Sequence, residues 1–131
     1  MVAMSKARSP NLSFTNLSFD REAYLANFSD METLAYETID SFLSILPALI
    51  FDIESAIRSR NAEGLQISAH TLKGNLSNFY AESAELLAWQ LEQMGHGKIM
   101  DATERVFQEL KVELSRFSND LKEFATKRKI E

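Results

Sequence analysis

Apolar residues recur at intervals of three and four along most of the chain, and this period most limits what the sequence can fold into. Residues at these intervals share one face of an α-helix, so each run predicts a helix that buries that face. The clearest run lies in a helix expected over 62–79 and steps by four, three, four and three residues, the spacing of a helix-bundle seam. It comprises Leu65, Ala69, Leu72, Leu76 and Phe79.

Three further runs predict helices before and after this one. The first opens near Ser29, fades near Arg58, and contains Pro47, which should kink the helix or start a new one. Its apolar residues are Leu34, Ile39, Phe42, Leu43, Leu46, Leu49, Ile50, Ile53, Ala56 and Ile57. A helix over about 83–94 has the apolar set Leu86, Leu87, Leu91 and Met94. The last helix carries Val106, Leu110, Leu114, Phe117, Leu121 and Phe124.

Polar residues in front of these runs predict where helices begin. Asp20 can cap the first turn of a short helix that precedes the long one. Ser29 with Glu32, and Asp101 with Glu104, have the spacing of a capping box, in which two side chains bond backbone amides at a helix start. We therefore expect helices to open at these three places.

The predicted fold is all-α: an antiparallel up-and-down four-helix bundle with a short extra N-terminal helix. Residues 18–127 are expected to form this bundle. The Ser- and Asn-rich segment 1–17 has no period and is expected to be a flexible N-terminal tail, and 128–131 a short C-terminal tail. We expect a monomer.

The composition excludes several classes of protein. The 131 residues include 4 Gly, 2 Pro and no Cys, too few turn formers for a sandwich or barrel and no thiol for a disulfide or a Cys-based metal site. Two of the glycines flank His96, where they predict a left-handed helix stop with His96 as a turn residue. Neither common type of glycine-rich phosphate-binding loop is present.

Charge and hydropathy narrow the partners and the location. Fourteen Lys and Arg against nineteen Asp and Glu give a net charge of −5, so we expect no nucleic-acid partner. The longest apolar stretch, 42–51, is well short of the ~20 residues that span a bilayer, and the N-terminus lacks the apolar run of a secretory signal. We expect a cytoplasmic protein without a membrane partner.

The seam also predicts which residues of the same helix face water. At about 100° per residue, His70 lies roughly 140° from the seam direction and therefore points outward. Gly74 follows it by one turn on the same face, and Lys73 lies at the flank within reach of His70. Other residues of this outward face are Ile67, Thr71, Ser77 and Asn78.

Gly74 is the residue that makes this face informative. A glycine in mid-helix costs roughly 1 kcal/mol relative to alanine, and an outward glycine has no packing reason to be there. It removes a side chain beside His70, while Ile67 offers an apolar contact and Lys73 a positive charge next to the imidazole. A solvated surface histidine is the simpler alternative. Together the four residues indicate a nucleophilic histidine presented to a protein partner.

The same residues resemble a known family. The run Ala69-His70-Thr71-Leu72-Lys73-Gly74 is followed by Asn78-Phe79-Tyr80-Ala81 and by Leu87 to Glu92. It closely resembles the His-x-Leu-Lys-Gly core of histidine-containing phosphotransfer (HPt) domains and the Leu-rich helix that follows it there. The run Phe42-Leu-Ser-Ile-Leu-Pro47 is similar to another helix of the family, and the resemblance spans roughly 20–124. The chain departs from the pattern at Leu76 and Ser77, and at Tyr80, where the family usually has Gly, so the following turn can differ.

The resemblance implies a role for each residue. His70 is the phospho-accepting residue, through Nε2, and Lys73 neutralises the phosphoryl group. Gly74 admits the partner's active site, and Glu92 orients the imidazole by accepting a hydrogen bond from Nδ1–H. The residues expected to contact the partner are Ile67, Thr71, Ser77 and Asn78. A basic position near His96 contacts the partner in some relatives.

The resemblance also implies the partners and the reaction. The chain would accept and donate a phosphoryl group between aspartyl-phosphate receiver domains of response regulators or a hybrid sensor kinase. It would have no kinase activity and no cofactor or metal site of its own, because the receiver brings Mg²⁺. Two alternatives remain: a receiver-binding or dimerisation bundle without phosphoryl uptake, and a bundle enzyme or metal carrier that uses His70 with carboxylates. Ile67 stands where a Glu-x-x-His metal pair needs its Glu.

Overall fold

The computed structural model describes residues 18–130, with side chains from 18 to 127. Within that range the chain forms five helices and no strand. The helices are α3 (Arg21–Ala26), α4 (Glu32–Arg58), α5 (Ala62–Ser77), α6 (Glu82–Gly97) and α7 (Thr103–Ile130). The predicted tail 1–17 lies outside the described residues, and α7 continues into the segment 128–131 that the sequence analysis assigned to a C-terminal tail.

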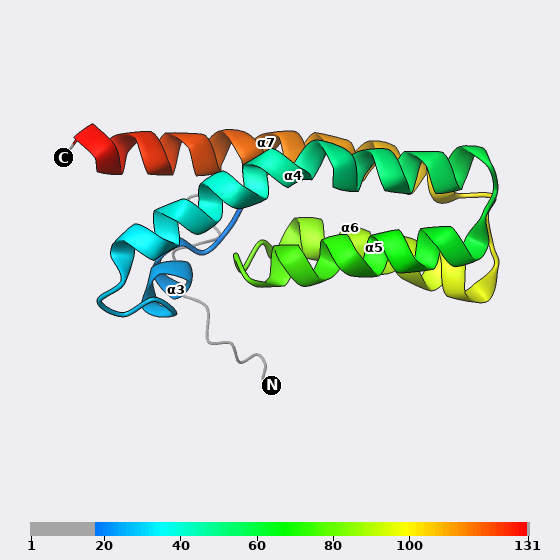
Figure 1. Ribbon diagram of the computed structural model, residues 1–131. Helices are drawn as coiled ribbons and strands as arrows, with labels where there is room; N and C mark the ends of the chain where they lie inside the picture. The colour runs from blue at the N-terminus through cyan, green and yellow to red at the C-terminus, as the bar shows by residue number, and fades with distance from the viewer. Residues whose placement is uncertain (1–17, 131) are drawn as a thin grey trace.

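The four long helices form an antiparallel bundle. In Figure 1, α4 lies beside α7 and α5 lies beside α6, and successive helices run in opposite directions. Contacts also join α4 to α5 and α6 to α7, so each long helix packs against two neighbours. The short α3 packs on α4 near one end of the bundle (Figure 1). The predicted four-helix bundle with a short extra N-terminal helix is therefore confirmed.

Large apolar side chains fill the bundle along the predicted seam. All five seam residues of the α5 region, from Leu65 to Phe79, are buried. Phe79 stacks on Tyr24 of α3 with ring centroids 4.9 Å apart, and it also contacts Phe42 and Phe117 at 4.9 and 5.6 Å. This aromatic cluster joins α3, α4 and α7 to the end of α5, so the helix that carries His70 is held from three sides.

The start and course of α4 differ from the expectation. The Ser29–Glu32 capping box is wrong: Ser29 lies in the preceding turn with φ 48°, and the helix begins at Glu32 after Met31, whose side chain makes no capping bond. Pro47 does not start a new helix but lies inside one continuous helix, which bends partway along its length (Figure 1). Proline has no N–H for the ladder, and its ring displaces the carbonyl one turn earlier.

By length and composition alone, α4 could cross a membrane. In the bundle, its residues Ile39, Phe42 and Ile53 are buried against the neighbouring helices. The set of residues predicted to be buried in this helix was partly wrong: Leu34 is exposed, and the smaller Ala35 next to it is buried. One face of α4 therefore packs in the bundle, while Ile45 and Phe51 of the same helix are exposed.

The end of α6 also differs. The helix continues through Gly95 and His96 to Gly97, and the left-handed cap residue is Lys98, with φ 59°. The predicted left-handed helix end is therefore present, but it falls on Lys98, neither glycine adopts it, and His96 lies within the helix. Gly95 is buried inside the helix, and a Cβ on it would lie 2.6 Å from the Gln66 nitrogen and 2.7 Å from the Ala62 oxygen. Its lack of a side chain lets α6 approach the backbone of α5 closely.

The buried face of α6 is made of smaller residues than predicted. Leu86, expected in the core, is exposed, and Leu87 and Met94 are only partly buried. The fully buried positions are Ala84, Ala88, Leu91 and Gly95. Small residues on this face are consistent with the close approach of α5 and α6.

Asp101 and Tyr80 lie at two further helix boundaries. Asp101 does not open α7 as a helix cap: the helix begins at Thr103, and the Asp101 carboxylate accepts a hydrogen bond from Arg60 at 3.3 Å. Tyr80 adopts the left-handed conformation, with φ 59°, in the turn between α5 and α6. Its carbonyl accepts from the Asp20 amide at 3.2 Å, which ties this turn to the start of α3.

Candidate functional site

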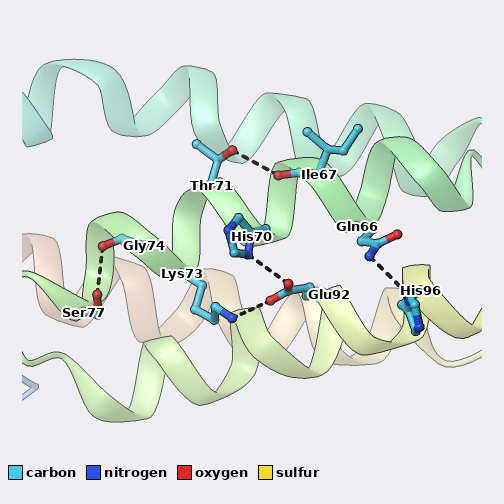
Figure 2. Close-up of polar contacts among 9 residues, drawn as sticks. All are labelled: Gln66, Ile67, His70, Thr71, Lys73, Gly74, Ser77, Glu92 and His96. Carbon is cyan, nitrogen blue, oxygen red and sulfur yellow. Dashed lines mark hydrogen bonds and ion pairs between the residues drawn. The ribbon is translucent and has the colours of Figure 1, made fainter.

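His70 projects from the exposed face of α5, opposite the residues that face the core. Its side chain is 66% exposed, while Ala69 and Leu72 on either side of it are completely buried. Figure 2 shows the imidazole beside Glu92 of the neighbouring helix α6. A helix that is packed in the bundle through its opposite face thus presents a solvent-accessible histidine ring.

Glu92 links His70 to Lys73. One carboxylate oxygen, Oε2, lies 2.9 Å from Nδ1 of His70, and the other, Oε1, lies 2.8 Å from Nζ of Lys73 (Figure 2). An ionised carboxylate can only accept, so Nδ1 of His70 donates the proton in this bond. The neutral ring then carries its lone pair on Nε2, the nitrogen that can act as a nucleophile toward a partner.

The Glu92 carboxylate is ionised in this arrangement. Its side chain is only 13% exposed, and this burial raises the pKa of Glu92, but the contacts and charges of Lys73 and His70 outweigh burial and hold the pKa below its usual value. A negative charge is therefore present beside His70 at neutral pH. Lys73 is 26% exposed, and its ammonium lies on the Glu92 side of the ring.

On its Gly74 side, His70 is bordered by a surface with little side-chain bulk. Gly74 is exposed, and a Cβ added there would meet no atom within 4 Å. One turn before His70, Ile67 is 60% exposed. The hydroxyls of Thr71 and Ser77 bond backward to the carbonyls of Ile67 and Gly74, so they lie flat on their own helix (Figure 2). A flat partner surface could thus reach His70 from this side.

Asn78 lies at the C-cap of α5, exposed at the far end of the same helix. His96 lies at the other end of this region, where its Nδ1 is 3.2 Å from the Gln66 amide (Figure 2). An open hollow of ≈430 Å³ lies over the exposed face of α5 beside Glu92 of α6, and His70 is one of its lining residues. Its lining residues are Glu63, Gln66, Ile67, His70, Thr71 and Glu92.

Glu63 and Gln66 were not singled out from the sequence. They lie seven and four residues before His70, so helical spacing alone could have placed them beside it. Within the described residues, no group of three or more His, Asp and Glu side chains is arranged to hold a metal ion. Ile67 occupies the position that a Glu-x-x-His pair needs for its carboxylate.

An all-α bundle that presents a histidine beside a lysine and a glycine on one long helix is the arrangement expected of a phosphotransfer bundle. The sequence matches the model of the Hpt domain over residues 37–120, which is more than half of the chain. That range includes His70, Lys73, Gly74 and Glu92. The chain therefore belongs to the Hpt domain family, whose members are histidine phosphotransfer intermediates of phosphorelays.

A solved structure supports the fold. The crystal structure of histidine-containing phosphotransfer protein B (HptB) from Pseudomonas aeruginosa PAO1 superposes with a TM-score of 0.79 at 17% sequence identity. The match covers 84% of this chain and 96% of that one. A comparison with curated protein sequences gives no significant match.

Proposed function

We propose that this chain accepts a phosphoryl group from the phosphoaspartate of one receiver domain and donates it to another, through phosphohistidine on Nε2 of His70. One observation supports this most directly. The 2.9 Å contact between Glu92 Oε2 and His70 Nδ1 leaves the lone pair on the exposed Nε2. The family membership supports the reaction class, and this contact supports Nε2 as the reacting atom.

The transfer needs no covalent machinery beyond the ring. The Nε2 lone pair attacks the phosphorus of the acyl phosphate, the N–P bond forms, and the P–O bond to the aspartate breaks, so that its carboxylate leaves with the electron pair. Donation is the reverse reaction. Phosphoryl transfer depends mainly on positioning and on neutralising charge, which we assign to Glu92 and Lys73 respectively. Mg²⁺ belongs to the receiver in this scheme.

Partner access is assigned to the exposed face of α5. Gly74 leaves space beside the ring for the receiver's active site. Ile67 supplies an apolar contact, and Thr71, Ser77 and Asn78 complete the surface on the same helix. Because Thr71 and Ser77 bond to their own backbone, we expect them to contribute shape more than new hydrogen bonds.

The remaining assignments follow from this function. We propose that residues 18–127 act as one monomeric phosphotransfer module in the cytoplasm, with receiver domains of response regulators or of a hybrid sensor kinase as partners. The module has no kinase activity in this scheme, because the phosphoryl group comes from the partner. A receiver-binding bundle without phosphoryl uptake is the alternative that the experiment must exclude.

The test is incubation of the chain with a radiolabelled phosphorylated receiver. We expect acid-labile, base-stable label on the wild type and none on His70→Gln. His96→Gln is the matched control, since it removes the other histidine, and it should take up label like the wild type. Equal labelling of His70→Gln contradicts the proposal, whereas receiver binding without label on the wild type supports the alternative.

A further inference from the structure

We propose that Glu92 is a positioning residue with a second role, which is to keep the Nδ1 proton on the ring of phosphorylated His70 and so keep the phosphohistidine able to donate. This inference rests on the proposed function and adds to it a step after phosphoryl uptake. It concerns the charge of the Glu92 side chain, beyond its ability to accept a hydrogen bond.

The geometry holds the carboxylate in one place. Glu92 is largely enclosed between α5 and α6, and its two oxygens contact two different side chains, Nδ1 of His70 at 2.9 Å and Nζ of Lys73 at 2.8 Å. An amide of the same shape could accept the bond from Nδ1–H, but it would bring no negative charge. The structure therefore places a fixed charge on the side of the ring that faces away from Nε2.

The proton balance of the reaction shows why this charge matters. When the neutral ring attacks through Nε2, Nδ1 keeps its proton, so the phosphorylated ring is a cation beside the Glu92 carboxylate. When a receiver's carboxylate later attacks the phosphorus, the N–P bond breaks and this ring leaves as neutral imidazole. If Nδ1 has lost its proton, the ring must leave as an imidazolate anion, a much poorer leaving group. Donation therefore requires the Nδ1 proton.

The charged groups around the ring set how strongly that proton is held. Glu92 faces it from α6, and Lys73 and Glu63 face the same region from α5, with His96 connected through Gln66. Glu92 is the only one of the described residues for which an ion-pair contact with the His70 ring is found. An opposite charge at this distance favours the protonated form of a ring.

The experiment phosphorylates the full chain with phosphoramidate, which needs no receiver, and follows the phosphohistidine by ³¹P NMR from pH 5 to 10. We expect Glu92→Gln to lower the pH midpoint at which the phosphorylated ring loses its proton by about one unit. Phosphoryl donation to a receiver at pH 8 should fall up to about tenfold, because a midpoint lower by one pH unit reduces the fraction of rings that carry the Nδ1 proton by up to tenfold. Glu63→Gln is the matched control, because it removes a charge from the same hollow without a contact to the ring, and its midpoint should shift clearly less than that of Glu92→Gln.

If the phosphorylated ring loses its proton at the same pH in the wild type and in Glu92→Gln, the inference is overturned. Lys73→Met gives an independent measurement if Glu92→Gln does not fold: removal of the cation should raise the midpoint, and an unchanged or lowered midpoint contradicts the electrostatic account. The two proposals fail differently. Absence of label on His70 of the wild type overturns the proposed function, whereas a labelled His70 with midpoints that do not respond to these substitutions overturns only the role of the Glu92 charge.

Discussion

Gly95 of α6 lies against the backbone of Gln66 in α5, and a Cβ on Gly95 would stand 2.6 Å from the Gln66 nitrogen. This close approach occurs one turn from Glu92 on α6, the residue that reaches His70 across the same pair of helices. The contact between the two backbones therefore sets the distance over which the Glu92 carboxylate meets the imidazole.

Gly95→Ala should destabilise the bundle. The added methyl group overlaps backbone atoms of Gln66 and Ala62, which cannot rotate away, so α6 must shift at a cost of about 1–3 kcal/mol. Urea unfolding measures this loss. The shift should also lengthen the contact between Glu92 and His70 and slow phosphoryl uptake. Wild-type stability of the variant would show that α5 and α6 can separate freely.

Gly74→Ala should have the opposite effect on stability. Nothing lies within 4 Å of the added Cβ, and replacing a mid-helix glycine by alanine should stabilise the chain by about 0.5–1 kcal/mol. Transfer from a phosphorylated receiver should nevertheless slow, because the methyl group stands beside His70 where the partner approaches. A stabilised variant that transfers at the wild-type rate would remove the access role assigned to Gly74.

The Glu92 carboxylate should contribute to stability in a pH-dependent way. Its pKa in the folded chain lies below the ordinary value of 4.5, so its ionised form favours folding above that value and the contribution is lost as the pH falls through the folded pKa. We expect Glu92→Gln to lower the free energy of unfolding at pH 7 by at most about 1 kcal/mol, because solvent screens the exposed His70. The difference between the two proteins should shrink below pH 4.5 in chemical denaturation. A difference that does not change with pH would mean that shape, and not charge, holds Glu92.

Tyr24 should hold its proton to unusually high pH. Burial raises the pKa of its phenol to about 12, and the hydroxyl donates to the Ala35 carbonyl at 2.6 Å. The folded chain binds this proton more tightly than the unfolded chain, so the stability contribution is complete at neutral pH and is lost as the pH rises from about 10 to about 12. Ultraviolet absorbance should show a phenol that titrates late and is missing in Tyr24→Phe. That variant should lose about 1 kcal/mol at pH 7, and an unchanged late phase would contradict the assignment.

The helices could be predicted from the sequence where large apolar residues define their faces. Leu65, Leu72 and Leu76 recur at helical spacing on one side of α5, so its buried side and the outward direction of His70 follow from spacing alone. In α6, the buried residues Ala84 and Ala88 are smaller than the exposed Leu86. Which face of α6 is buried depends on how closely α5 approaches it. The spacing of apolar residues within α6 carries no information about that distance.

Local signals failed where tertiary contacts compete with them. Gly95 resembles a helix stop in the sequence, but it is buried within α6 because α5 leaves no space for a side chain. Asp101 has the position of a cap but pairs with Arg60, which is remote in the sequence. The contact of Glu92 with His70 was expected only from the family resemblance, and its ion pair with Lys73 was not expected, because both depend on the register of two helices.

The position of the phosphoryl group is the most direct test of the proposed relay. The chain is phosphorylated by a receiver, and the product is examined by ³¹P and ¹⁵N NMR together with mass spectrometry of its peptides. The account predicts a single phosphohistidine, on Nε2 of His70. A phosphoryl group on Nδ1 of His70, on His96, or on any other side chain would contradict it.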